Sequence, residues 1–305
     1  MFMMIDPYVS GGTNAAVLVM ARAALRSARA RLAGAVLLGA LLSGAASAQP
    51  CGSVVTLPAH GAARLQYALA VPEAPQAVRG ALVLLAGGDG VLDLDDQGCP
   101  RLLKGNSLVR SSPLFRAAGW ATAMVDAPSD HRQEDGLAAF RASAEHADDL
   151  GRVIADLRRR GYQPVWVVGT SRGSISAANA AARLRGPVAP DGMVLTSLLT
   201  VGTVAGRKPW TAQTVFDLPL EAVSVPALLV GHALDRCMRS PADAMPRVEA
   251  RLTSSRRQVV VVAGGSGTEG PRGLDACEGR SPHGFHGQEA ELVTGILRFI
   301  DGGRY

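Results

Sequence analysis

The chain has 305 residues, of which 48% are hydrophobic and 4% aromatic, and its formal net charge is +5. This length is more than one small domain needs and suits one large α/β domain with a sizeable core built from Ala, Val and Leu. No run of Lys and Arg with interleaved aromatic residues is present, which argues against a nucleic-acid-binding protein.

The first 48 residues have the pattern of an export signal. A basic stretch from Met20, an apolar run at residues 32–42 and a small-residue cleavage site at residues 46–48 follow one another. The apolar run is shorter than the ~20 residues that span a bilayer. We therefore expect residues 1–48 to be a signal region cleaved after Ala48, with Met20 as an alternative start and an uncleaved anchor as the competing interpretation. The mature protein would be periplasmic or secreted and would have no stable membrane span.

The predicted signal region accounts for most of the net charge. It contains four arginines and one acidic residue, which is +3 of the total of +5, so the remaining 257 residues are near +2. A basic surface for an acidic partner is therefore not indicated. We expect residues 49–305 to form a single domain, because they contain no internal repeat and no long linker.

The pattern of apolar residues predicts an α/β sandwich. Residues 49–75 are expected to add one or two antiparallel strands at a sheet edge. Short apolar runs then alternate with helical patterns, which is typical of a mostly parallel central sheet in a three-layer α/β/α arrangement. A helical pattern at about residues 140–157 ends at Gly161, and the last helix starts near Glu289. The predicted strands are residues 81–85, 121–125, 165–168, 193–196, 227–230 and 259–262.

The motif Gly-Thr-Ser-Arg-Gly, centred on Ser171, follows a predicted strand and precedes a run of small residues typical of a helix. A strand that turns directly into a helix holds the serine in a strained conformation, and flanking glycines remove the Cβ atoms that would clash. The Ser171 hydroxyl would lie above the carboxyl end of the sheet, with the backbone N–H of Arg172 facing the same space. The alternative is a tight turn with an incidental serine, so a catalytic role requires a base and an acid elsewhere.

Asp235 and His283 follow later strands and complete a predicted triad with the serine. Asp235 lies five residues beyond the strand predicted at residues 227–230, although a helix cap or a surface acid is the alternative role. His283 and His286 both lie between the last strand and the last helix. We favour His283 as the base, because the Gly-Phe pair that follows it lets the chain turn and anchors the loop. For His232 we expect a structural hydrogen bond.

The order Ser, Asp, His, each after a successive strand, resembles that of the α/β-hydrolase superfamily from about residue 81 to the C-terminus. The His-Gly-Phe sequence at the base is similar to the dienelactone-hydrolase-like branch of the serine esterases. The resemblance implies that Ser171 attacks a small ester-like substrate and forms an acyl-enzyme, that His283 moves the proton, and that Asp235 orients the imidazole. This chemistry requires no metal and no cofactor.

The glycine-rich stretch after residues 81–85 is expected to supply the second oxyanion donor. Members of the superfamily often have a His-Gly pair here, and Ala86 in the place of that histidine is a departure from the pattern. Because Gly87 and Gly88 allow close approach, we expect the N–H of Gly88 to act together with that of Arg172. A plain glycine-rich turn is the alternative. This stretch contains no G-x-G-x-x-G motif, so a dinucleotide site here has no support.

Four polar residues near two predicted strand ends could line a cleft, but we expect them to cap helices and to pair with one another. They are Asn106, Arg110, Asp126 and Asp130.

All four cysteines lie in the predicted mature chain. An even number in an exported protein indicates disulfides, and the lack of a C-x-x-C pair argues against a zinc or thioredoxin-like site. Four cysteines allow three pairings. In the fold that the resemblance implies, the loops of the acid and the base are neighbours, which favours Cys237 with Cys277 and leaves Cys51 with Cys99.

Two other functions fit the same residues. An acyltransferase would use the same triad with an alcohol in place of water. A non-catalytic exported binding protein could keep the fold alone, although the intact Ser/Asp/His set argues against it. The sequence identifies neither the substrate nor the oligomeric state.

Overall fold

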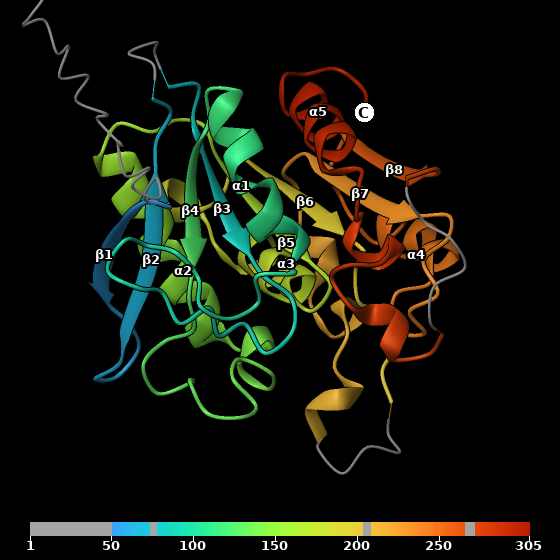
Figure 1. The fold of residues 1–305 in the computed structure, drawn as a ribbon, viewed down its shortest axis with the longest axis horizontal. Helices are drawn as coiled ribbons and strands as arrows, with labels where there is room; N and C mark the ends of the chain where they lie inside the picture. The colour runs from blue at the N-terminus through green and yellow to red at the C-terminus, as the bar shows by residue number, and fades with distance from the viewer. Residues whose placement is uncertain (1–50, 74–77, 204–208, 266–271) are drawn as a thin grey trace, which may run out of the picture. The chain divides into compact units, whose positions relative to one another are not determined.

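A mixed, mostly parallel sheet of eight strands organises the protein in a computed structural model that describes residues 51–73, 78–203, 209–265 and 272–305 (Figure 1). The strand order is β1-β2-β4-β3-β5-β6-β7-β8. The first two strands, β1 (Ser53–Pro58) and β2 (Arg64–Ala70), are antiparallel, and β2 pairs antiparallel with β4. The other strands are parallel: β3 (Ala81–Leu85), β4 (Ala121–Val125), β5 (Val165–Thr170), β6 (Gly192–Thr196), β7 (Ala227–His232) and β8 (Arg257–Val262).

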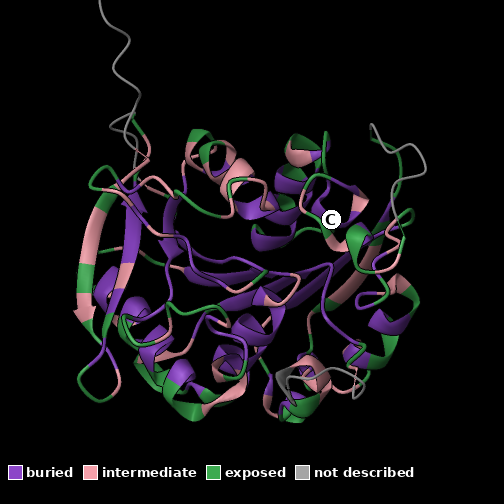
Figure 2. Cartoon of the chain, turned by 60° about the horizontal axis from the view of Figure 1, so that its bottom comes forward, coloured by how far each residue is buried: buried purple, intermediate pink, exposed green. Residues whose placement is uncertain are grey.

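Helices cover both faces of this sheet, and the central strands are buried between them (Figure 2). One face packs against α1 (Ser107–Ala117) and α5 (Glu289–Ile300). The other face packs against α2 (Ala144–Arg159), α3 (Gly173–Arg183) and α4 (Met245–Glu249). The predicted three-layer α/β/α class is confirmed. None of the helices in the described ranges is long and apolar enough to cross a bilayer, and the predicted signal region lies outside those ranges.

The central strands are mostly apolar because they are buried on both faces. In β3, Leu82 and Leu84 pack in the layer of α1 and α5. The alternate residues Ala81, Val83 and Leu85 pack toward α2 and α3. Side chains alternate between the faces of a strand, so a parallel strand between two helical layers needs a continuous apolar run. The apolar runs that predicted the strands arise from this double burial.

Three helical segments differ from the sequence prediction, and one of them, the short helix α4, was not predicted. The stretch predicted as one helix is a 3₁₀ turn at Phe140–Ala142 followed by α2, because Ser143 is extended and caps α2 by accepting a hydrogen bond from the backbone of His146. Helix α1 was not predicted at all. Asn106 caps it, and its polar sequence with an internal proline, Pro113, conceals the apolar face that the helix buries.

The layer assignment can be tested at Leu150 of α2, which is fully buried. We expect Leu150→Ala to lower the free energy of unfolding by about 2–5 kcal/mol, because the substitution leaves a cavity. Leu102→Ala is the matched control: Leu102 is 48% exposed, so its loss should change stability by no more than about 0.5 kcal/mol. Urea denaturation measures both, and an equal effect would contradict the assignment of Leu150 to the core.

Candidate active site

The turn between β5 and α3 holds Ser171 in a strained conformation. Its φ is 51°, which is unusual for a residue other than glycine. A Cβ atom on Gly169 would lie 2.3 Å from the carbonyl oxygen of Gly173, and one on Gly173 would lie 2.0 Å from that of Leu85. Both glycines are therefore required by the close approach of α3 to β5 and β3. The backbone has the sharp turn that the motif predicted.

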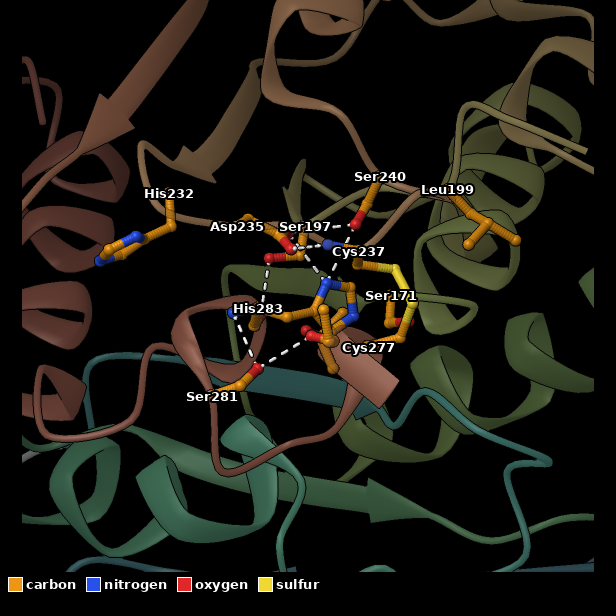
Figure 3. A network of polar contacts seen from close by, with 12 residues as sticks. Ser171, Ser197, Leu199, His232, Asp235, Cys237, Ser240, Cys277, Ser281 and His283 are labelled. Atoms are coloured by element: carbon orange, nitrogen blue, oxygen red, sulfur yellow. Dashed lines mark hydrogen bonds and ion pairs between the residues drawn. A yellow bond between two sulfur atoms is a disulfide. The ribbon is translucent and has the colours of Figure 1, made fainter. Parts of the chain in front are cut away.

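The loops after β7 and β8 bring Asp235 and His283 together. Nδ1 of His283 donates to Oδ2 of Asp235 at 2.9 Å, and both side chains are almost completely buried. Figure 3 shows this pair at the centre of a polar network. His286, the competing histidine, is exposed and lies outside the pair. Of the two histidines considered from the sequence, the structure places His283 next to the acid.

Ser240 is part of the same network and was not predicted. Its hydroxyl donates to Oδ2 of Asp235 at 3.1 Å and lies 3.0 Å from Nδ1 of His283. The second carboxylate oxygen of Asp235 accepts from the backbone N–H of Cys237 at 2.8 Å. Both oxygens of the buried carboxylate are thus held in place. Nothing in the sequence distinguishes Ser240 from the other serines for this role, except that it lies shortly after Asp235.

The end of β6 joins the serine to the histidine. The backbone N–H of Ser171 donates to the carbonyl of Thr196 at 2.9 Å, and the hydroxyl of the next residue, Ser197, donates to the carbonyl of His283 at 2.7 Å. Figure 3 shows the side chains of both Ser171 and His283. Nε2 of His283 is buried and has no hydrogen-bond partner within the described part of the chain, so its bond to Ser171 is not formed here. Such catalytic bonds are often long before substrate binds.

The base loop is fixed by its own contacts as well. The backbone N–H of His283 donates to the hydroxyl of Ser281 at 3.1 Å, and Phe285 is fully buried in the core, as the Gly-Phe pair suggested. At the end of β7, Nε2 of His232 contacts Oε1 of Gln288 at 2.7 Å, which agrees with the structural role expected for this histidine.

A disulfide between Cys237 and Cys277 covalently joins the acid loop to the base loop (Figure 3). The second disulfide joins Cys51 to Cys99. This is the pairing that we expected from the neighbouring loops. The first bridge limits the separation of the two loops that hold Asp235 and His283.

The glycine-rich stretch after β3 approaches the serine closely. A Cβ atom on Gly87 would lie 2.9 Å from Cβ of Ser171, so a side chain cannot fit there. Gly88 has a φ of +60° and faces Leu103. Arg172 precedes α3 directly and stands at its N-terminus. The use of the Gly88 and Arg172 N–H groups as oxyanion donors stays a prediction.

Arg141, which the sequence did not single out, is buried behind this stretch with an exposed fraction of 1%. Its Nη2 donates to the carbonyl of Ala86 at 3.1 Å and approaches those of Gly87 and Gly88 at 3.4 Å, while Nη1 donates to Ser176 at 2.9 Å. In a planar trans peptide the N–H points away from the carbonyl. Carbonyls drawn toward Arg141 therefore turn the N–H groups of the following residues away from it.

Two arginines, Arg141 and Arg172, lie near one another next to the elbow, together with the acidic residues Asp89 and Asp135. Burial, followed by the charge of Arg172, lowers the pKa of Arg141 to about 9. Burial, followed by the charge of Arg239, lowers the pKa of Arg172 to about 10. Both guanidinium groups remain protonated at neutral pH, and Asp89 is close enough to oppose both shifts. A transient oxyanion at Ser171 would form next to these positive charges.

The four polar residues near the strand ends make structural contacts. Asn106 caps α1, and Arg110 donates to Glu289 at 2.8 Å and to the carbonyl of Gly284 at 2.7 Å. Asp126 accepts from the backbone of Leu92. Asp130 contacts a histidine described below. These contacts fit the capping and pairing that we expected.

The two disulfides allow a test of how Asp235 and His283, two members of the predicted triad, are positioned. We expect Cys237→Ser/Cys277→Ser to lose roughly 4 kcal/mol of stability, by the chain-entropy account of a bridge across a loop of this length, and most of the rate of ester turnover. The matched control is Cys51→Ser/Cys99→Ser, whose bridge spans 48 residues rather than 40. The control should lose similar stability and keep its turnover at a temperature where both variants are folded. Full turnover by the first variant would show that the triad does not depend on the bridge.

Solved structures of other proteins share the fold of this chain. No protein-family model and no curated protein matches the chain. Thermogutta terrifontis esterase 2 is 15% identical, over 84% of this chain and 97% of that one, with a TM-score of 0.53. A proline iminopeptidase of Mycobacterium smegmatis is 12% identical, over 82% and 98%, with a TM-score of 0.53. A dienelactone hydrolase of Anabaena variabilis is 18% identical, over 83% and 96%, with a TM-score of 0.48. The chain has the α/β-hydrolase fold.

Proposed function

We propose that this protein is an exported serine hydrolase that cleaves an ester-like acyl bond through Ser171, His283 and Asp235. The observation that carries the proposal is the pairing of His283 with a buried carboxylate while its other ring nitrogen, Nε2, is buried without a partner in the described chain. A serine with positive φ stands at the adjacent elbow. Solved esterases share the fold, which supports a hydrolase.

The proposed reaction proceeds in two half-reactions. Nε2 of His283 removes the proton of the Ser171 hydroxyl as its oxygen attacks the substrate carbonyl, and Asp235 stabilises the imidazolium that forms. The N–H groups of Arg172 and Gly88 would receive the oxyanion. The imidazolium protonates the leaving alcohol, and the acyl-enzyme remains. Water, deprotonated by His283, then attacks the acyl carbon, and Ser171 recovers its proton as the acid product leaves.

The loops around the triad support an apolar acyl or alcohol group. Seven large hydrophobic side chains are exposed in the described part of the chain, and five of them lie on loops that follow β3, β6, β7 and β8. These five are Leu102, Val201, Leu234, Met238 and Leu274. The carboxyl ends of these parallel strands share one edge of the sheet with the serine. A small ester with an apolar part fits this surface better than a highly charged one.

Two observations support a periplasmic or secreted location. Residues 1–48 have the pattern of a signal peptide. All four cysteines are paired in two disulfides, which form and persist in oxidising compartments.

Fluorophosphonate labelling of the mature, disulfide-intact protein tests the proposal, with intact mass and peptide mapping as the readout. We expect one adduct on the peptide that contains Ser171, because only an activated serine reacts. Ser171→Ala should abolish labelling, and His283→Ala should slow it by roughly 10²–10⁴-fold. His286→Ala, a substitution in the same loop, should leave the labelling rate unchanged.

The outcomes separate the competing functions. No adduct on a folded protein would contradict the hydrolase and favour an exported binding protein. An adduct with transfer of the acyl group to an added alcohol, and little free acid among the products, would indicate an acyltransferase. Loss of labelling in His286→Ala but not in His283→Ala would reverse the assignment of the base.

Arg141 gives a second test, because it orients the oxyanion stretch without touching the substrate. We expect Arg141→Met to lower kcat roughly tenfold to a hundredfold with little change in KM, since a misplaced donor weakens only the transition state. Arg141→Lys should recover part of the loss. Arg304→Met, which removes an exposed arginine near the last residue of the chain, is the control. An unchanged kcat in a folded Arg141→Met variant would contradict the positioning role.

A further inference from the structure

A second cluster of titratable side chains lies two strands away from the serine, at the end of the sheet that contains β2 and β4. His60 comes from the turn between β1 and β2. Asp130 and His131 come from the loop that leads from β4 to α2, and Asp149 belongs to α2. The proposed hydrolase reaction uses none of these four residues. Segments that are far apart in the sequence thus contribute imidazole and carboxylate groups to one place.

The spacing of the three outer groups suits a metal ion. His60, Asp130 and His131 each offer one ligand atom, and these atoms all lie within 4.8 Å of one another. Nε2 of His60 lies 3.0 Å from Oδ2 of Asp130. Two ligands bound tetrahedrally at ~2.0 Å from a zinc ion are about 3.3 Å apart. The observed separation is therefore close to that of two ligands on one ion.

Asp149 fixes the orientation of the first imidazole. One of its carboxylate oxygens accepts from Nδ1 of His60 at 2.7 Å, and the other accepts from the backbone N–H of the same residue at 2.8 Å. The Asp149 side chain is almost fully buried, with 1% exposed. A carboxylate on the far nitrogen of a histidine sets its tautomer and directs the near nitrogen at a metal. Nε2 of His60 is in this way presented toward Asp130.

The second imidazole is held by stacking. The ring of His131 is stacked on that of Phe140, with centroids 4.1 Å apart, and lies 5.8 Å from the ring of His60. Across the described residues, neither ring nitrogen of His131 makes a hydrogen bond to the protein. Its orientation is thus fixed while its nitrogens remain available to a ligand.

We infer that His60, Asp130 and His131 form a binding site for a divalent transition metal ion, of which Zn²⁺ is the best match, with Asp149 as the supporting carboxylate. Two imidazoles and one carboxylate suit zinc and its neighbours in the first transition row, whereas Ca²⁺ and Mg²⁺ prefer oxygen ligands. Water would complete a tetrahedral shell. The ion has no part in the proposed acyl transfer and would act on the structure.

The position of the site indicates what the ion would do. It would join the turn between β1 and β2 to the loop between β4 and α2. That loop continues through Phe140, the stacking partner of His131, to Arg141, which binds the carbonyls behind the serine. A bound ion would therefore restrain the segment that carries Arg141. The inferred metal site does not depend on the hydrolase proposal, and either one can be wrong without the other.

Metal titration of the mature, disulfide-intact protein, freed of any affinity tag and of chelators, tests the inference. We expect one equivalent of Zn²⁺ to bind by calorimetry and to raise Tm by several degrees, because an ion that binds only the folded state stabilises it. Co²⁺ in the same site should show the visible absorption bands of a tetrahedral complex. The triad histidine could bind metal as well, so each measurement is repeated in a His283→Ala background.

Matched variants locate the ion. His131→Ala and Asp130→Ala change partly or largely exposed positions and should weaken Zn²⁺ binding by about tenfold or more. Asp149→Asn should weaken it to a lesser extent. His286→Ala, which removes an exposed histidine elsewhere, should bind as the parent does. Failure to bind Zn²⁺ and Co²⁺ at millimolar concentration, or equal binding by the parent and His131→Ala, would overturn the inference and leave His60 in an ordinary ion pair with its two carboxylates.

Discussion

The close approach of α3 to β5 and β3 is the constraint on which the rest of the site depends. Gly169 and Gly173 have no room for a side chain, and the turn between them forces a positive φ on Ser171. This strain is tolerated because β5 is central in the sheet and buried on both faces. The fold thus places a strained serine at a rigid position, and the flexible loops only need to approach it.

Those loops have only short regular elements, a 3₁₀ turn at Pro282–Gly284 and an isolated bridge between Cys237 and Gly273, and other contacts hold them as well. The hydroxyl of Ser197 binds the carbonyl of His283, Ser240 and a backbone N–H bind Asp235, and a disulfide closes the pair of loops. Buried polar groups are costly unless they are bonded. Within the Asp235–His283 pair, both carboxylate oxygens and one ring nitrogen are bonded, so Nε2 is the one atom of the pair that is left unbonded in the described chain. The unsatisfied atom is the one that the proposed chemistry needs.

The sequence predicted the features that depend on local pattern. Central strands were visible as apolar runs because they are buried on both faces, and the elbow was visible because two glycines and a serine must follow a strand. Helix α1 was missed, since Pro113 and its polar residues mask the apolar face. Ser240 and Arg141 were missed because their roles depend on contacts with segments distant in the sequence. In an arginine-rich chain, nothing local distinguishes Arg141 and Arg239, the two arginines that are buried in the described part of the chain, from the others.

Arg141 links the two sites of the molecule. A buried guanidinium requires many acceptors, and this one finds them mainly in the carbonyls of the stretch after β3. These contacts fix the orientation of the carbonyls and, with it, the direction of the N–H groups that follow them. The segment that carries Arg141 also carries Phe140, which stacks on His131 of the second cluster. Two adjacent residues, Phe140 and Arg141, therefore contact the second cluster and the stretch after β3, respectively.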